Sequence, residues 1–152
     1  MVKLSQILKA VNSKLAEAFP DIKIDSKDLS EKFNRPSFRT ELDRLKTSAF
    51  MTTYKEREFT VRIYFFPTKQ DKGRLERLKV IDVIESTFLQ TLEIKLSEEE
   101  EKKFTFHIPI EEMNFEETDG ILIASFDSYT FEEIENDITG EMMEELEFNY
   151  KN

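Results

Sequence analysis

Cysteine and tryptophan are absent from this chain of 152 residues, and histidine and glycine are scarce. Without cysteine the chain has no disulfide, no thiolate nucleophile and no Cys-ligated zinc or iron–sulfur centre, and its composition suits reducing, intracellular surroundings. The three glycines, Gly73, Gly120 and Gly140, are too scattered for a phosphate-cradling loop or a dinucleotide fingerprint. We therefore expect no nucleotide, no metal and no other cofactor.

The chain also has little material for a catalytic centre. His107 is the only histidine, and it lies in the alternating segment FTFHIPI, where a strand residue is the more usual role. Ser125 and Ser128 are the candidate nucleophiles for a Ser–His–Asp triad with His107, but neither lies in a Gly-x-Ser-x-Gly elbow. A hydrolase that works through His107 is thus the weakest interpretation, and we predict that the protein is not an enzyme.

Long hydrophobic runs are missing as well. Lys3, Lys9 and Lys14 interrupt the apolar pattern at the N-terminus, so this segment has neither the h-region of a signal peptide nor a membrane span. We expect no membrane contact and a protein that stays in the compartment where it is made.

Charge is abundant but unevenly placed. The formal net charge is -10, which argues against a nucleic-acid binder that depends on clustered cationic contacts to phosphate. Residues 1–97 carry +5, whereas residues 98–152 carry -15. The acidic part is either a solvated tail that keeps the protein soluble or a surface that contacts a basic surface on another molecule.

Two stretches have the apolar spacing of an amphipathic helix. One runs from about Ser5 to Ala18, where the following Pro20 stops it, and the other from about Arg74 to Leu89. Each is expected to pack its apolar stripe against a sheet. In the second helix the predicted stripe consists of Leu75, Leu78, Ile81, Ile84 and Phe88.

A two-residue alternation elsewhere predicts strands. It covers Phe38–Leu42 and Phe59–Phe65, and the segment LKTSAFMTTYKERE between them has no Gly or Pro to force a tight turn. We predict a long hairpin whose distal part projects beyond the core. Further strands are expected near Leu92, Phe104 and Met113 and from Ile121 to Phe131, with Asp119-Gly120 as a hairpin turn.

This order of elements predicts an α+β fold: a mainly antiparallel β-sheet with two α-helices packed on one face, a long β-hairpin and an acidic C-terminal tail. Residues 1–131 would form a single domain and residues 132–152 the tail. The 14 Phe and 4 Tyr side chains lie mostly in or beside strands, and the interior of so small a domain cannot bury both faces of every strand. Some aromatic side chains should therefore face partners.

Several segments resemble, in their order and spacing, a family of phage tail terminator proteins found in tailed phages and phage-tail-like particles of low-GC Gram-positive bacteria. The similarity extends from the N-terminal helix through about Phe131. It rests on AFPDIKIDSKDL, RPSFRTELDRLKTS, YKEREFTVRIYFFP followed by a helix, and TDGILIASFDSYTF. The most similar details are Phe19-Pro20, Pro36-x-Phe38, Tyr64-Phe65-Phe66-Pro67 and Asp119-Gly120.

The resemblance implies a structural virion protein without catalytic residues. Such terminators form a ring, typically a hexamer, that caps the tail tube, ends tail polymerisation and offers a docking surface for the head or neck. The implied partners are other copies of the chain, the tail tube protein, the neck or head–tail connector protein and, if the tail is contractile, the sheath protein. DNA would only pass through the lumen. The implied location is the head-proximal end of the tail, after assembly in the host cytoplasm.

The charge asymmetry suggests where copies meet. We expect basic residues of the long hairpin to face acidic residues of the C-terminal half in a neighbouring subunit or in the tube. An acidic lumen would also repel passing DNA. The candidate interface residues are Arg39, Arg44, Lys46, Phe50, Tyr54, Lys55, Arg57, Glu132, Glu133, Glu135 and Asp137.

One alternative from another class stays open. The chain could be a small acidic adaptor or inhibitor, for example a DNA mimic, that binds a basic host or phage protein. Its carboxylates would be Glu132, Glu133, Glu135, Asp137, Glu144, Glu145 and Glu147.

Overall fold

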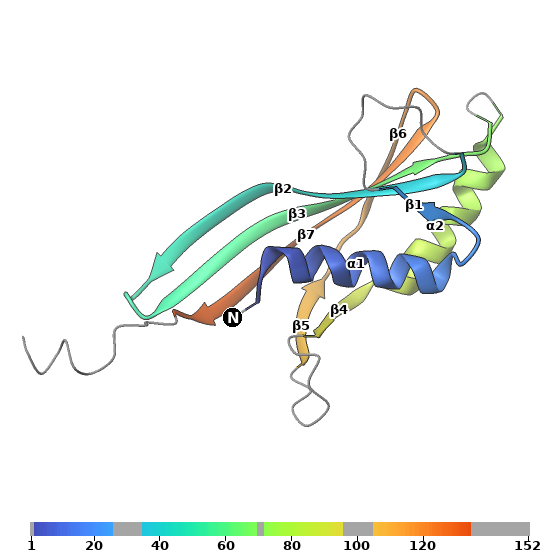
Figure 1. Ribbon diagram of the computed structural model, residues 1–152. Helices are drawn as coiled ribbons and strands as arrows, with labels where there is room; N and C mark the ends of the chain where they lie inside the picture. Colours follow the sequence, from blue (N-terminus) through green and yellow to red (C-terminus); the bar gives the residue numbers. More distant parts are fainter. Residues whose placement is uncertain (1, 26–34, 70–71, 96–104, 135–152) are drawn as a thin grey trace, which may run out of the picture.

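The structure is a computed structural model that describes residues 2–25, 35–69, 72–95 and 105–134 (Figure 1). Two helices and seven strands lie in these residues. In chain order they are α1 (Leu4–Ala18), β1 (Lys23–Ile24), β2 (Ser37–Phe50), β3 (Tyr54–Phe66), α2 (Arg74–Phe88), β4 (Gln90–Lys95), β5 (Thr105–Ile110), β6 (Asn114–Thr118) and β7 (Ile121–Glu133).

The main sheet has the strand order β1-β2-β3-β7-β6. Only the short β1 is parallel to its neighbour β2, and the other pairs in the sheet are antiparallel. The predicted α+β class with a mainly antiparallel sheet is thus confirmed. The strands β4 and β5 pair with each other in a separate two-stranded sheet, an arrangement that the alternating pattern alone did not predict.

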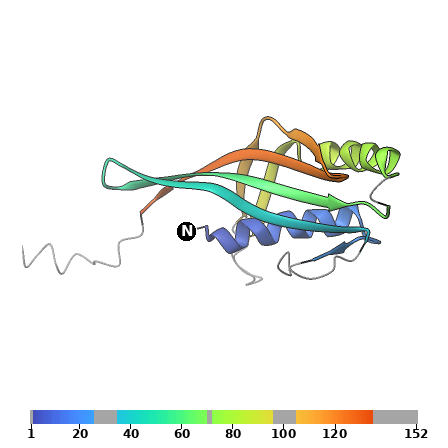
Figure 2. The same ribbon diagram turned by 90° about the horizontal axis from the view of Figure 1, so that it is seen from above.

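The core lies on one face of the main sheet, which we call the inner face. Alternate residues of β3 point into it, and Phe59, Val61, Ile63 and Phe65 are at most 2% exposed. The helices and the β4–β5 sheet lie on this side (Figures 1 and 2). Burial of this apolar stripe, at about 25 cal/mol per Å² of apolar area removed from water, is what holds the layers together.

The two helices differ in how well their predicted stripes match the core. In α1, Ile7, Val11 and Leu15 are fully buried, as the spacing predicts. In α2, Ile84 and Phe88 are buried, but the expectation for its first two turns was wrong, because Leu75 and Leu78 are 73% and 49% exposed.

Arg77 is the physical reason for this orientation of α2. It is 8% exposed, forms an ion pair with Glu117 of β6 and donates a hydrogen bond to the Gly120 carbonyl at 3.3 Å. This polar anchor turns the first part of the helix so that Arg77 and Val80 face inward. Leu75 and Leu78 therefore face solvent.

The long hairpin is confirmed, and its distal part extends past the N-terminus of α1 (Figures 1 and 2). Met51 and Thr52 turn the chain with φ of 52° and 59°, a left-handed conformation achieved here without glycine. Strand β7 follows β3 to its end, since Tyr54 pairs with Glu133. The projection is therefore three-stranded. We call residues 45–58 and 128–133 the arm.

Asp119 and Gly120 form the predicted turn between β6 and β7, with φ of 51° and 78°. Both values lie in the left-handed region that such a turn requires, which Gly adopts without a Cβ clash. The hairpin turn predicted at Asp119-Gly120 is therefore confirmed.

Candidate assembly surfaces

A bulge in β2 marks the point where the arm leaves the core. Asp43 pairs with Thr60 and Lys46 with Glu58, so β2 contains one residue more than β3 in this interval. Arg44 lies in the bulge with a φ of 51°. Because a bulge increases the local twist and bends the strand, it determines the direction in which the distal part of the hairpin points.

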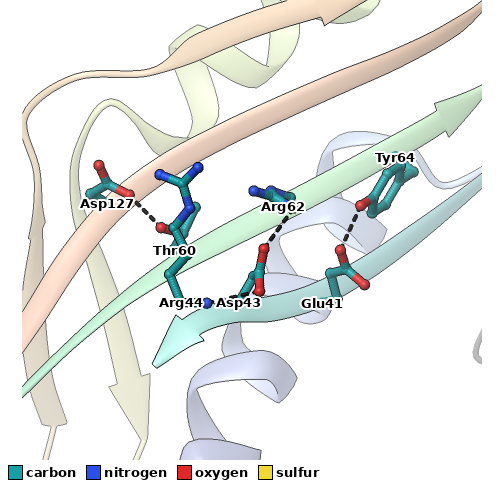
Figure 3. A network of polar contacts seen from close by, with 7 residues as sticks. All are labelled: Glu41, Asp43, Arg44, Thr60, Arg62, Tyr64 and Asp127. Atoms are coloured by element: carbon teal, nitrogen blue, oxygen red, sulfur yellow. Dashed lines mark hydrogen bonds and ion pairs between the residues drawn. The ribbon is translucent and has the colours of Figure 1, made fainter. Parts of the chain in front are cut away.

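A network of polar side chains fixes this bulge on the outer face of the sheet (Figure 3). Asp43 accepts a hydrogen bond of 2.8 Å from the Arg44 backbone N–H and forms an ion pair of 2.6 Å with Arg62. Thr60 donates a hydrogen bond to Asp127 of β7. Strands β2, β3 and β7 are therefore tied together at the base of the arm.

Tyr64 extends the network by donating a hydrogen bond to Glu41. Burial raises the pKa of the Tyr64 phenol, the hydrogen bond to the Glu41 carboxylate raises it further, and Arg62 opposes both. The phenol therefore keeps its proton, and with it the link to β2, to a higher pH than an ordinary tyrosine.

Aromatic side chains gather on the outer face of the arm. The rings of Tyr54 and Phe131 are stacked with centroids 5.2 Å apart and planes at 12°, and Phe50 meets Phe131 edge-on at 5.9 Å. Tyr129 lies two residues before Phe131 on the same face of β7. All four are between 39% and 52% exposed, so the arm carries an apolar surface that the described part of the chain leaves open to solvent.

The inner face of the arm is polar and connects to the start of the chain. The Arg57 guanidinium donates a hydrogen bond to the Val2 carbonyl at 2.9 Å, and the Val2 N–H donates one to the Glu132 carboxylate at 3.0 Å. Lys55 lies opposite Glu132 in the β3–β7 register. Basic hairpin residues and acidic β7 residues thus already meet within one chain.

The structure brings most of the predicted interface residues together. Phe50 and Tyr54 lie on the outer face of the arm, Lys55, Arg57 and Glu132 on its inner face, and Glu133 at the end of β7. Lys46 is at the base of the arm, 4.0 Å from Glu58, and both side chains are more than half exposed.

Two other predicted residues lie outside the arm or at its boundary, and two are not among the described residues. Arg44 is at the bulge, and Arg39 lies opposite Tyr64 in the core-proximal half of the hairpin. Glu135 and Asp137 lie outside the described residues, as does most of the predicted acidic tail.

Sequence reasoning missed Tyr129 and Phe131 as surface residues. The signal was present as a change of phase, because Leu122, Ala124 and Phe126 occupy even positions in β7, whereas Tyr129 and Phe131 occupy odd ones. A strand that changes its apolar phase presents apolar side chains on both faces in succession.

Three observations on the described residues bear on the other functional classes considered from the sequence. Within residues 2–25, 35–69, 72–95 and 105–134, no group of three or more His, Cys, Asp or Glu side chains is placed to hold a metal ion. His107 is an exposed strand residue opposite Glu93. Neither of the two described helices has the length and hydropathy to cross a membrane.

A sequence model of the family described as phage tail terminator protein matches residues 6–140. No curated protein matches the chain. The family match covers α1 from Gln6 onward, α2, the arm and the whole of the main sheet. It assigns the protein a structural role in a phage tail and a place in the virion. The chain therefore belongs to the phage tail terminator family.

Proposed function

We propose that this protein assembles into a closed ring, typically of six copies, that caps the tail tube and ends its polymerisation. The observation that carries the proposal is the family match over residues 6–140. The three-stranded arm supports it, because an extended element with exposed aromatic side chains can reach a neighbouring subunit. A ring requires a heterologous contact in which two different patches meet, and the arm supplies one of them.

The proposed ring has further partners at its two faces. One face would contact the tail tube protein, and the other would dock the neck or head–tail connector protein. In a contractile tail the ring would also meet the last ring of sheath protein. Assembly would take place in the host cytoplasm. All of the interface residues predicted from the sequence stay candidates for these contacts: Arg39, Arg44, Lys46, Phe50, Tyr54, Lys55, Arg57, Glu132, Glu133, Glu135 and Asp137.

DNA is proposed to pass through the ring without being held. The net charge of -10 supports this role, because a surplus of carboxylates repels the phosphate backbone. A ring whose inner wall is basic would contradict this part of the proposal.

Electron microscopy of purified protein mixed with tail tubes tests the cap. We expect a ring at one end of each tube and tubes that no longer lengthen when tube protein is added. Bovine serum albumin, an acidic protein without a tail role, is the control for nonspecific adsorption. Decoration along the whole tube, or bare tube ends at saturating protein, would overturn the proposal.

A further inference from the structure

The exposed large apolar side chains of the described residues fall into two groups. Six lie on the arm or in its turn, and the other three lie on α2 or directly after it. They are Leu45, Phe50, Met51, Tyr54, Tyr129 and Phe131 in the first group and Leu75, Leu78 and Leu89 in the second. The arm and α2 lie at opposite ends of the molecule in both views (Figures 1 and 2).

The first group has an acidic border. Phe50, Tyr54, Tyr129 and Phe131 form what we call the arm patch. Three carboxylates, Glu56, Glu58 and Glu133, occupy alternate positions on the same face of β3 and β7. Two exposed cations offset part of this charge, since Lys46 lies 4.0 Å from Glu58 and Arg44 lines a hollow together with Glu58 and Tyr129. Three carboxylates against two cations leave the border with a small net negative charge.

The second group has a basic border. Leu75 and Leu78, which we call the α2 patch, lie on the solvent side of the first two turns of α2, with Lys72, Arg74 and Lys79 exposed around them. The one carboxylate in these turns, Glu76, is turned toward the preceding loop, where it accepts hydrogen bonds from the Thr68 N–H and hydroxyl. Asp82 is also exposed, one turn after Leu78, so the three cations around the α2 patch outnumber two neighbouring carboxylates and the border keeps a small net positive charge.

We propose that the arm patch of one copy docks on the α2 patch of the next copy around the ring. This inference rests on the proposed ring and names its interface. The two patches match in character, aromatic with acidic border against aliphatic with basic border, and such complementarity steers encounter and fixes register. Aromatic anchors lose little rotamer entropy when they dock, which suits the centre of an interface.

A second copy of this chain is the occupant that the observations favour over another protein. Both halves of the complementary pair lie on the same polypeptide, and they lie too far apart at its two ends to meet within one copy. A contact between unlike patches at opposite ends is heterologous and repeats from copy to copy, and it closes into a ring when the rotation allows.

Charge reversal on either side tests the pairing. The arm variant carries Glu56→Lys and Glu133→Lys, and the α2 variant carries Arg74→Glu and Lys79→Glu. Each variant alone should self-associate at least about tenfold more weakly, measured by sedimentation and by ring counts on tube ends. The control variant, Glu17→Lys with Glu112→Lys, changes two exposed carboxylates outside both patches and should assemble as the parent does.

Combining the variants distinguishes the loss of charge complementarity between the two patches from misfolding of the subunit. A chain that carries all four changes should assemble again, because each patch then meets its new opposite. A mixture of the arm variant and the α2 variant should assemble too, as rings in which the two alternate. Melting temperatures near that of the parent show that each variant is folded. Failure of both combinations to recover rings, with folded subunits, would overturn the proposal.

The absence of cysteine permits a second, geometric test. Ser48 is exposed on the arm beside Glu56, and Asp82 is exposed on α2 one turn after Leu78. On capped tubes, a short bismaleimide should link Ser48→Cys chains to Asp82→Cys chains only as dimers. A chain with both changes should give a ladder of larger oligomers.

Each remaining outcome has a definite meaning. Dimers formed by Ser48→Cys chains alone would indicate that arm meets arm and would overturn the proposal. Capped tubes without any link would place the interface elsewhere and would overturn it as well. If the unmodified protein leaves tube ends bare, the proposed capping function is wrong. That outcome is distinguishable from a wrong interface, in which the tubes are capped but the cross-links do not form as expected.

Discussion

The core-proximal and distal halves of the β2–β3 hairpin use the same strands but carry their apolar side chains on opposite faces. In the proximal half, Val61 and Ile63 point into the core, and the outer face carries polar residues such as Arg62. In the distal half, aromatic rings lie on the outer face, and Lys55 and Arg57 lie on the inner one. The bulge separates the two halves.

This inversion shows that one pair of strands can serve two purposes. The proximal half builds a folding unit, because its apolar face is covered by helices. The distal half leaves its apolar face uncovered, so its side chains contribute little to the stability of a single copy and remain available for contact with another. Stability and assembly should therefore respond differently to the same kind of substitution in the two halves.

The largest expected effect is a loss of folding stability when a buried aromatic residue on the core side of the sheet is truncated. Phe126 of β7 is 1% exposed and lies 6.2 Å from the Phe88 ring, so Phe126→Ala should lower the free energy of unfolding by about 3–5 kcal/mol. Urea denaturation measures this loss. In a domain of ordinary stability it is a large part of the total.

The matched change in the distal half is Phe131→Ala, five residues later in the same strand. Phe131 is 46% exposed, so this change should lower the free energy of unfolding by about 1 kcal/mol or less. Its main effect should be on ring formation. Equal losses of stability for Phe126→Ala and Phe131→Ala would remove the distinction between the two halves.

Much of the fold could be predicted because local periodicity is strong. The stripe of Ile7, Val11 and Leu15, the alternation from Phe59 to Phe65 and the turn at Asp119-Gly120 are each confirmed. These features depend on residues close together in sequence, where spacing alone identifies the buried side.

The surfaces were harder to predict, because they depend on pairs far apart in sequence. The orientation of α2 depends on Arg77 meeting Glu117, forty residues later. The third strand of the arm depends on Tyr54 pairing with Glu133. A sequence pattern gives the period of a helix or strand. It does not show which distant polar group will pair with one of its side chains and so decide which face of the element is buried.

The second expected effect concerns the bulge that separates the halves. Asp43→Ala removes the acceptor of the Arg44 N–H and the partner of Arg62, and it should lower the free energy of unfolding by about 1 kcal/mol. Ring formation should fall more than this loss explains, because the arm no longer has a fixed direction. Hydrogen exchange of residues 45–58 should speed up.

Asp43→Asn provides the matched control at the bulge. Its amide oxygen can still accept from the Arg44 N–H, but the charge that pairs with Arg62 is gone. Exchange in the arm should therefore stay closer to that of the parent than in Asp43→Ala. If the two variants are alike in both exchange and assembly, the backbone contact of Asp43 does not hold the arm.

The smallest expected effect lies in the proximal half and depends on pH. The folded state raises the pKa of Tyr64 above the ordinary value of 10.0, chiefly through burial and then through the hydrogen bond to Glu41. A raised pKa means that the folded state holds this proton more tightly than the unfolded state does. The resulting stabilisation is therefore complete below pH 10 and is lost as the pH rises through the folded-state pKa.

Tyr64→Phe removes this titration and leaves the other tyrosines in place. Below pH 10 the parent should be more stable than Tyr64→Phe by about 1 kcal/mol or less, as expected for one partly exposed hydrogen bond. The difference should shrink as the pH rises further. Urea denaturation of both proteins at matched pH measures it, and a difference that stays constant would contradict the raised pKa. Because Tyr64 is on the core side of the bulge, its loss should leave ring formation unchanged at neutral pH, in contrast to changes on the arm.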